Sequence, residues 1–154
     1  MSVHPGLASV EFLLGTWEGA GKGVYSTIEP FSYNEEIRFT HVGRPFLVYS
    51  QRTWNDDGQP MHAETGFWRF LRDGRVELVL AHATGIVEIE EGSVSGTTLE
   101  LSSTLVTGTS TAKDVRTLSR RFTVDGDVLR YTVDMEAVDQ PLQRHLEAEL
   151  RRVT

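Results

Sequence analysis

The chain has 154 residues, of which 39% are hydrophobic, and its formal net charge is −7. This length and composition fit one compact domain over residues 1–154, and the acidic balance argues against a nucleic-acid partner, which needs a positive field. The chain has no cysteine, which excludes disulfides, cysteine metal sites and a thiol nucleophile. Neither a signal peptide nor a long apolar run is recognisable, so we expect a cytoplasmic protein without a membrane segment.

A short helix is the first element that the sequence predicts. Residues 5–14 place Leu7, Val10 and Leu14 at a spacing that would cover one end of a barrel. After this segment, residues of alternating character, rich in Val, Thr, Phe, Tyr and Trp, predict strands separated by turn signals such as Asp73-Gly74 and Asp125-Gly126. The expected strands are 16–25, 33–42, 46–54, 61–71, 75–82, 86–94, 98–106, 113–124, 128–138 and 143–153.

The last of these segments fits two structures. Leu142, Leu146 and Leu150 recur at helical spacing, while Leu146, Ala148 and Leu150 also alternate as in a strand. We predict a strand, because a meander that starts at Trp17 needs a final strand to close it. The fold class is therefore all-β: an antiparallel up-and-down barrel of about ten strands, similar to lipocalins and fatty-acid-binding proteins, with an internal cavity.

Glycines dominate one face of the first expected strand. Alternation places Trp17, Gly19, Gly21, Gly23 and Tyr25 on this face. Interior glycines indicate either tight curvature or the close approach of a ligand or another backbone, and the sequence leaves both interpretations open.

The same segment carries a family motif. Gly-Thr-Trp-Glu-Gly-Ala-Gly, with Gly15, Trp17, Gly19 and Gly21, resembles the Gly-x-Trp-x-Gly-x-Gly motif of the nitrobindin family. Residues 23–31 continue the resemblance, although Ser26 stands where the family usually has proline, which frees φ and adds a hydrogen-bond donor. Further similar segments follow in family order: His-Val-Gly-Arg-Pro-Phe-Leu at 41–47, Met-His-x-Glu-Thr-Gly at 61–66, Val-Glu-Leu-Val-Leu-Ala-His at 76–82, Gly-Ile-Val-Glu-Ile-Glu at 85–90 and Gln-Pro-Leu-Gln-Arg-His-Leu at 140–146.

The resemblance implies a function. It implies one partly exposed ferric heme b per chain, with His145 as the axial iron ligand and with Thr27 and Lys113 near the heme. The implied activity is isomerisation of peroxynitrite to nitrate, with reversible nitric oxide binding, in a monomer or homodimer. Because full inward orientation of the strand face that carries His145 would also bury two glutamates, we expect His145 near the rim.

The other histidines have simpler interpretations. His4 lies in the N-terminal segment, and His41 and His82 each precede a glycine turn, where an imidazole commonly bonds the backbone. His62 and Glu64 share a strand face, so a non-heme metal site of these two residues and His82 is an alternative.

Two further expectations concern the strand faces and the ligand. The Glu88-Ile89-Glu90-Glu91 segment predicts glutamates on a solvated face, with Ile89 turned inward. A barrel with a cavity is also a common container for apolar molecules, so a heme-free, lipocalin-like carrier is the main alternative function.

Overall fold

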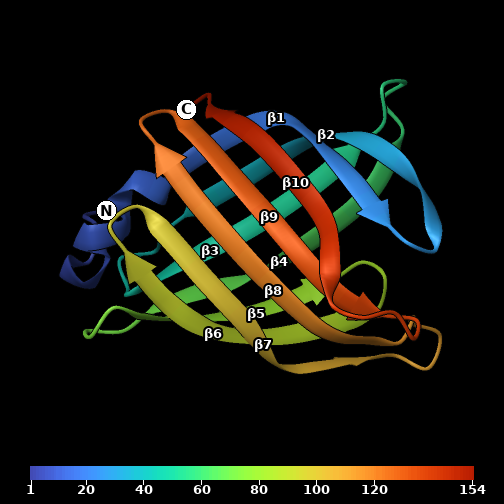
Figure 1. Ribbon diagram of the computed structural model, residues 1–154. Helices are drawn as coiled ribbons and strands as arrows, with labels where there is room; N and C mark the ends of the chain where they lie inside the picture. The colour runs from blue at the N-terminus through green and yellow to red at the C-terminus, as the bar shows by residue number, and fades with distance from the viewer.

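The computed structural model describes residues 1–154 as a closed antiparallel barrel of ten strands with one short helix (Figure 1). Each strand pairs with its neighbours in sequence, and β1 pairs with β10 to close the barrel. The predicted fold class is confirmed. The elements are the 3-10 helix η1 (Pro5–Leu13) and the strands β1 (Gly15–Tyr25), β2 (Ile28–Thr40), β3 (Phe46–Trp54), β4 (Pro60–Phe70), β5 (Arg75–His82), β6 (Ile86–Ser95), β7 (Thr98–Gly108), β8 (Val115–Asp125), β9 (Val128–Ala137) and β10 (Gln143–Arg152).

The helix differs from the expected one in its inward residues. Leu7, Val10 and Leu13 are buried, whereas Leu14 is only partly buried. A 3-10 helix has three residues per turn, so a spacing of exactly three places Leu13 on the buried face in place of Leu14. The helix is not long and apolar enough to cross a membrane.

The two ends of the barrel have different structures. The helix and both chain termini lie at one end, on the left in Figure 1. We call the opposite end the mouth; it carries the turns β1–β2, β3–β4, β5–β6, β7–β8 and β9–β10. The core that packs against the helix is rich in aromatic side chains, among them Trp17, Phe39, Tyr49, Trp68 and Phe122. Side chains therefore fill the helix end of the barrel.

The ambiguous C-terminal segment is a strand, as predicted, and β2 begins at Ile28, five residues earlier than expected.

The wall of the barrel opens between β7 and β8, which pair only from Thr98 with Thr123 to Ser102 with Ser119. Beyond that point, toward the mouth, the two strands separate. A pocket of about 300 Å³ lies there, lined by residues that include Val106, Lys113 and Val115.

Candidate functional site at the barrel mouth

His145 lies in an irregularity of β10 close to the mouth. Arg144 pairs with Asp134 and Leu146 pairs with Val133, so His145 is the extra residue of a β-bulge. A bulge redirects the side chain at its position. The imidazole contacts β1 and β2, where Tyr25 and Phe31 present rings whose centroids are 5.6 and 6.5 Å from that of His145, both edge-on.

One nitrogen of His145 is held by the backbone. Nδ1 lies 3.0 Å from the carbonyl oxygen of Val24, and Nε2 has no hydrogen-bond partner. A carbonyl oxygen only accepts, so Nδ1 carries the proton and Nε2 carries the lone pair. Burial lowers the pKa of the imidazole, and the nearby positive charge of Lys113 adds to this effect. His145 therefore presents a neutral imidazole with a free Nε2, as an axial metal ligand requires.

Tyr25 anchors the strand end beside His145. Its hydroxyl accepts a hydrogen bond of 2.9 Å from the amide of Ala137 and lies 3.1 Å from the carbonyl oxygen of Met135. The ring that flanks His145 thus also fixes the end of β9, and the side chain of Tyr25 is buried.

Thr27 and Lys113 lie at the same end of the barrel as His145. Thr27 is in the β1–β2 turn, and Lys113 is in the β7–β8 loop; both are exposed. Lys113 has no ion-pair partner, and its charge acts on the imidazole of His145. The structure thus brings the three predicted residues to the mouth.

Ser26 uses both of its donors in the β1–β2 turn. Its amide donates to Oε1 of Gln143 at 3.1 Å, and its hydroxyl donates to Oε1 of Gln140 at 2.8 Å. These bonds tie the turn to β10 and to the loop that precedes it. The backbone amide that a proline would lack is therefore used as a donor, and the turn is held by residues of β10 and of the loop before it.

The glycines of β1 serve two purposes. A Cβ atom at Gly19 would collide with the backbone of β10 at Glu149. At Gly21 and Gly23 it would collide with the rings of Tyr33 and Phe31, which cover these glycines. Close approach of another backbone is thus found at Gly19, whereas the other two glycines accommodate aromatic rings, one of which flanks His145.

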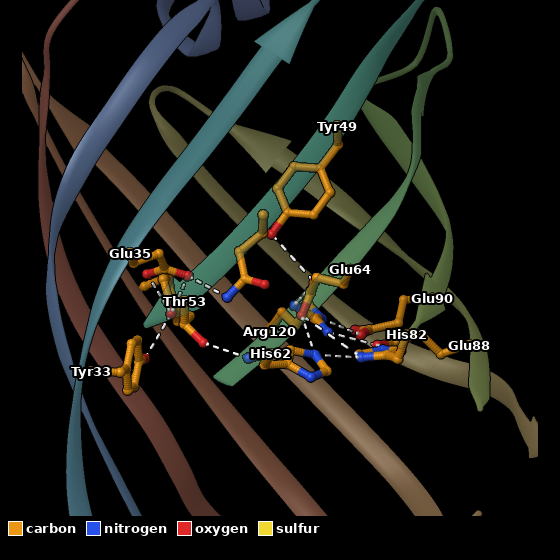
Figure 2. A network of polar contacts seen from close by, with 12 residues as sticks. Tyr33, Glu35, Tyr49, Thr53, His62, Glu64, His82, Glu88, Glu90 and Arg120 are labelled. Carbon is orange, nitrogen blue, oxygen red and sulfur yellow. Dashed lines mark hydrogen bonds and ion pairs between the residues drawn. The ribbon is translucent and has the colours of Figure 1, made fainter. Parts of the chain in front are cut away.

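Below the mouth, the barrel contains a buried ion cluster around Arg120 (Figure 2). Arg120 donates from Nη1 to Glu64 at 3.2 Å, from Nη2 to Glu88 at 2.6 Å and from Nε to Glu90 at 2.9 Å. Burial alone would lower the pKa of Arg120, but the three glutamates raise it well above its usual value. The arginine is therefore a permanent cation in the interior.

The prediction for the Glu88–Glu91 segment is wrong for two of its glutamates. Glu88 and Glu90 are 1% and 0% exposed and point inward, whereas Ile89 is 36% exposed. Charged side chains rarely enter a core unpaired, and this tendency favoured the opposite orientation. Arg120, from β8, supplies the counter-charge that makes the inward orientation tolerable.

His82 departs from its predicted role, because it bonds side chains and not its turn. Its Nε2 lies 2.5 Å from Oε1 of Glu88, and its Nδ1 lies 3.1 Å from Nε2 of His62. His62 and Glu64 share the inward face of β4 as expected, with His62 Nε2 and Glu64 Oε1 3.5 Å apart. The three residues that the sequence grouped as an alternative metal site thus lie together in the structure.

A second buried polar group lies on the other side of the interior. Glu35 is 1% exposed and accepts hydrogen bonds from Gln51 at 2.6 Å and from Tyr131 at 2.7 Å. The Tyr131 hydroxyl also lies 2.7 Å from that of Tyr33. Burial raises the pKa of Glu35 to about 7, although its hydrogen bonds oppose this shift.

The comparisons with known proteins match nearly the whole chain. Residues 6–152 match the family described as the THAP4-like, heme-binding beta-barrel domain. The chain belongs to this family. It is 55% identical to a protein of Mycobacterium avium (strain 104) named peroxynitrite isomerase 2, over 97% of this chain and 96% of that protein. It is 54% identical to a peroxynitrite isomerase of Nocardia farcinica (strain IFM 10152), over 99% and 94% of the two chains.

A solved structure agrees with this assignment. The crystal structure of Rv2717c from M. tuberculosis superposes with a TM-score of 0.93 at 48% identity, covering 99% of this chain and 100% of that one. The resemblance drawn from the sequence motifs is confirmed at the level of the family.

The five histidines of this heme-binding barrel differ in what they offer a metal. In His4 and His41, Nδ1 accepts a backbone hydrogen bond, from Gly6 and Gly43 respectively, so the proton resides on Nε2. The prediction that His41 bonds its turn is confirmed. Both residues lie at the helix end, away from the mouth. His62 and His82 lie below the mouth, where they bond each other and carboxylates. His145 alone combines a place at the mouth with an Nε2 lone pair that no protein group occupies, so the residues present fit a heme.

Proposed function

We propose that the protein binds one ferric heme b through Nε2 of His145 and isomerises peroxynitrite to nitrate, with reversible nitric oxide binding at the same iron. The observation that carries the proposal is the hydrogen bond from Nδ1 of His145 to Val24, which leaves Nε2 free and unprotonated. Membership of a heme-binding family and relatives named peroxynitrite isomerase support it.

Heme, when bound, would supply a Lewis-acidic iron with one coordination position open to a small inorganic ligand. The contribution of the chain is positional. The carbonyl of Val24 fixes the tautomer and the tilt of the His145 ring, and the edges of Tyr25 and Phe31 restrict its rotation. No acid–base dyad of the chain is needed for an isomerisation in which no proton is gained or lost.

Lys113 and Thr27 have supporting roles in this proposal. The chain carries a net charge of −7, which repels the peroxynitrite anion. Lys113 is an unpaired cation at the mouth, so it offsets this repulsion locally and can pair with a heme carboxylate. Thr27 offers a hydroxyl group at the same rim.

The interior argues against the apolar carrier. A fatty acid that enters below the mouth would meet Glu35, Glu64, Glu88, Glu90 and Arg120, all buried. An apolar ligand cannot replace the water or protein partners of such groups, and each unpartnered charge is costly. A flat ring bound near His145 at the rim avoids this cost.

Titration with hemin tests the proposal. Wild type should develop a ferric Soret band that saturates at one equivalent, His145→Ala should not, and His41→Ala should behave like wild type because His41 lies at the opposite end. Loaded wild type should then accelerate peroxynitrite decay with nitrate as the product, and nitric oxide should shift the Soret band reversibly. Failure of wild type to bind hemin, or equal binding by His145→Ala, would overturn the proposal.

A further inference from the structure

Three potential ligand atoms converge below the mouth, apart from His145. His62 Nε2, His82 Nδ1 and Glu64 Oε1 form a triangle with sides of 3.1, 3.5 and 3.8 Å. Ligand atoms bound at about 2.0–2.1 Å to a tetrahedral zinc ion lie roughly 3.4 Å apart, so the triangle has nearly the size that one ion needs. Figure 2 shows the two imidazoles and the carboxylate directed at one another.

The partners of each group leave these three atoms available. Nε2 of His82 donates to Glu88, so Nδ1 of His82 bears a lone pair. Glu64 uses Oε2 for Arg120 and for the Tyr49 hydroxyl, at 3.2 and 3.3 Å, which leaves Oε1 facing the imidazoles. A carboxylate behind a ligating histidine, as Glu88 is behind His82, commonly orients it and raises its basicity.

A single N–H hydrogen, the one on Nε2 of His62, lies among the three ligand atoms. Nε2 of His62 can donate to Nδ1 of His82, and Nδ1 of His62 has no partner. If that proton moves to Nδ1, then Nε2 of His62 also presents a lone pair. A cation can therefore occupy the position that this proton leaves, and His62 keeps the proton on Nδ1.

The charge of the surroundings favours a cation. Burial raises the pKa of Glu90 to about 10, so Glu90 is protonated, and the interior holds the carboxylates of Glu64 and Glu88 against the single guanidinium of Arg120. A divalent cation would reduce this excess of negative charge.

We propose that His62, Glu64 and His82 bind one divalent cation of the zinc class, separate from the heme site, with a fourth position directed to the mouth. Two imidazole nitrogens and one carboxylate oxygen are typical zinc ligands, and three protein ligands leave one position for water. The side chain of His62 is 29% exposed, against 10% for His82 and 5% for Glu64, so the ion enters past His62.

The test titrates the full-length protein with Zn²⁺ by calorimetry, both hemin-free and hemin-loaded. The hemin-free protein is also titrated with Co²⁺, whose visible absorption reports tetrahedral nitrogen and oxygen ligands. Wild type should bind one equivalent in either state. His62→Ala and His82→Ala should weaken binding by about a hundredfold or more, because each removes a ligand.

Two controls separate this site from the others. His41→Ala removes a histidine at the opposite end and should bind zinc like wild type. His145→Ala should also retain zinc, so that failure of the heme proposal leaves this one standing. Should His82→Ala not fold, His62→Ala and His62→Gln decide, since His62 is half-buried and its side chain bonds only within the cluster. Absence of binding in wild type, undiminished binding in the His62 variants, or loss of zinc in folded His145→Ala would each refute the proposal.

Discussion

The imidazole of His145 is oriented by the backbone of Val24, with Nδ1 and the carbonyl oxygen 3.0 Å apart. Val24 lies on the first strand and His145 on the last, and these strands pair to close the barrel. The closure that removes the edges of the sheet therefore also positions the proposed heme ligand. Changes that loosen the β1–β10 pairing next to the mouth should therefore affect heme binding.

Replacement of Tyr25 by phenylalanine should destabilise the mouth. The variant keeps the ring beside His145 but leaves the amide of Ala137, a residue only 3% exposed, without its acceptor. An unsatisfied buried donor costs about 1–3 kcal/mol. We expect urea unfolding to report a loss of this size, together with faster release of hemin. Ser26→Ala, which removes an exposed hydrogen bond at the same end, should cost much less; equal effects of the two changes would contradict the assignment.

Two adjacent arginines should respond very differently to alanine substitution. Arg120→Ala leaves buried carboxylates without their cation and should lower the free energy of unfolding by about 3–5 kcal/mol. Arg121 is exposed and pairs with Glu100 on the outer surface, so Arg121→Ala should cost about 0–1 kcal/mol. Denaturant unfolding of both variants measures the contrast, and similar losses would show that the interior cluster is hydrated.

Glu35 should make stability depend on pH. Its pKa is raised from 4.5 to about 7 by burial, and Tyr33, Tyr131, Glu64 and Arg120 are the titratable groups that face it. At Glu35 the native state thus retains a proton that the unfolded chain releases, so the contribution of this residue to the free energy of unfolding should fall as pH rises from about 4.5 to about 7. The shift corresponds to about 3 kcal/mol.

Glu35→Gln removes this titration while keeping an acceptor for Tyr131. Relative to wild type, the variant should become more stable as the pH is raised through this window, by up to about 3 kcal/mol. Unfolding curves measured across the range provide the test, with Glu91→Gln, an exposed position, as the control. A difference between wild type and Glu35→Gln that does not change with pH would rule out a raised pKa.

The barrel was predictable because its signals are local. Alternation and turn residues such as Asp73-Gly74 define strands without reference to the rest of the chain, and Gly74 indeed adopts a positive φ of 81°. The orientation of Glu88 and Glu90 was not predictable in this way. Alternation separates them from Ile89 but does not say which set is buried, and the deciding partner, Arg120, is 30 residues from Glu90 in sequence.

In the candidate site, too, local sequence identified residues, but their orientation and partners depend on distant segments. The motif identified His145, but parity along β10 could not give its direction because a bulge falls at that residue. For His82, the turn that follows suggested a backbone bond, whereas Glu88 on the next strand provides a stronger, charged acceptor. Bulges and cross-strand partners depend on register, which no single segment specifies.

The glycines of β1 provide the last prediction, because their neighbours differ in kind. At Gly19 the obstacle is the backbone of Glu149 and Leu150, which can move only if the β1–β10 pairing opens. At Gly23 the obstacle is the half-buried ring of Phe31, which can rotate. Gly19→Ala should therefore cost about 3 kcal/mol of stability, and Gly23→Ala closer to about 1 kcal/mol.

Hemin binding should reverse this order, because Gly23→Ala should lose more hemin affinity than Gly19→Ala. Rotation of Phe31 in Gly23→Ala alters an edge contact with His145, so the hemin affinity should fall by more than the small loss of stability implies. In Gly19→Ala, protein that remains folded should bind hemin in proportion to its folded fraction, which circular dichroism measures in the same samples. If Gly23→Ala destabilises the barrel as much as Gly19→Ala, the ring does not yield, and the glycine is then required for packing and not for the freedom of the aromatic group beside His145.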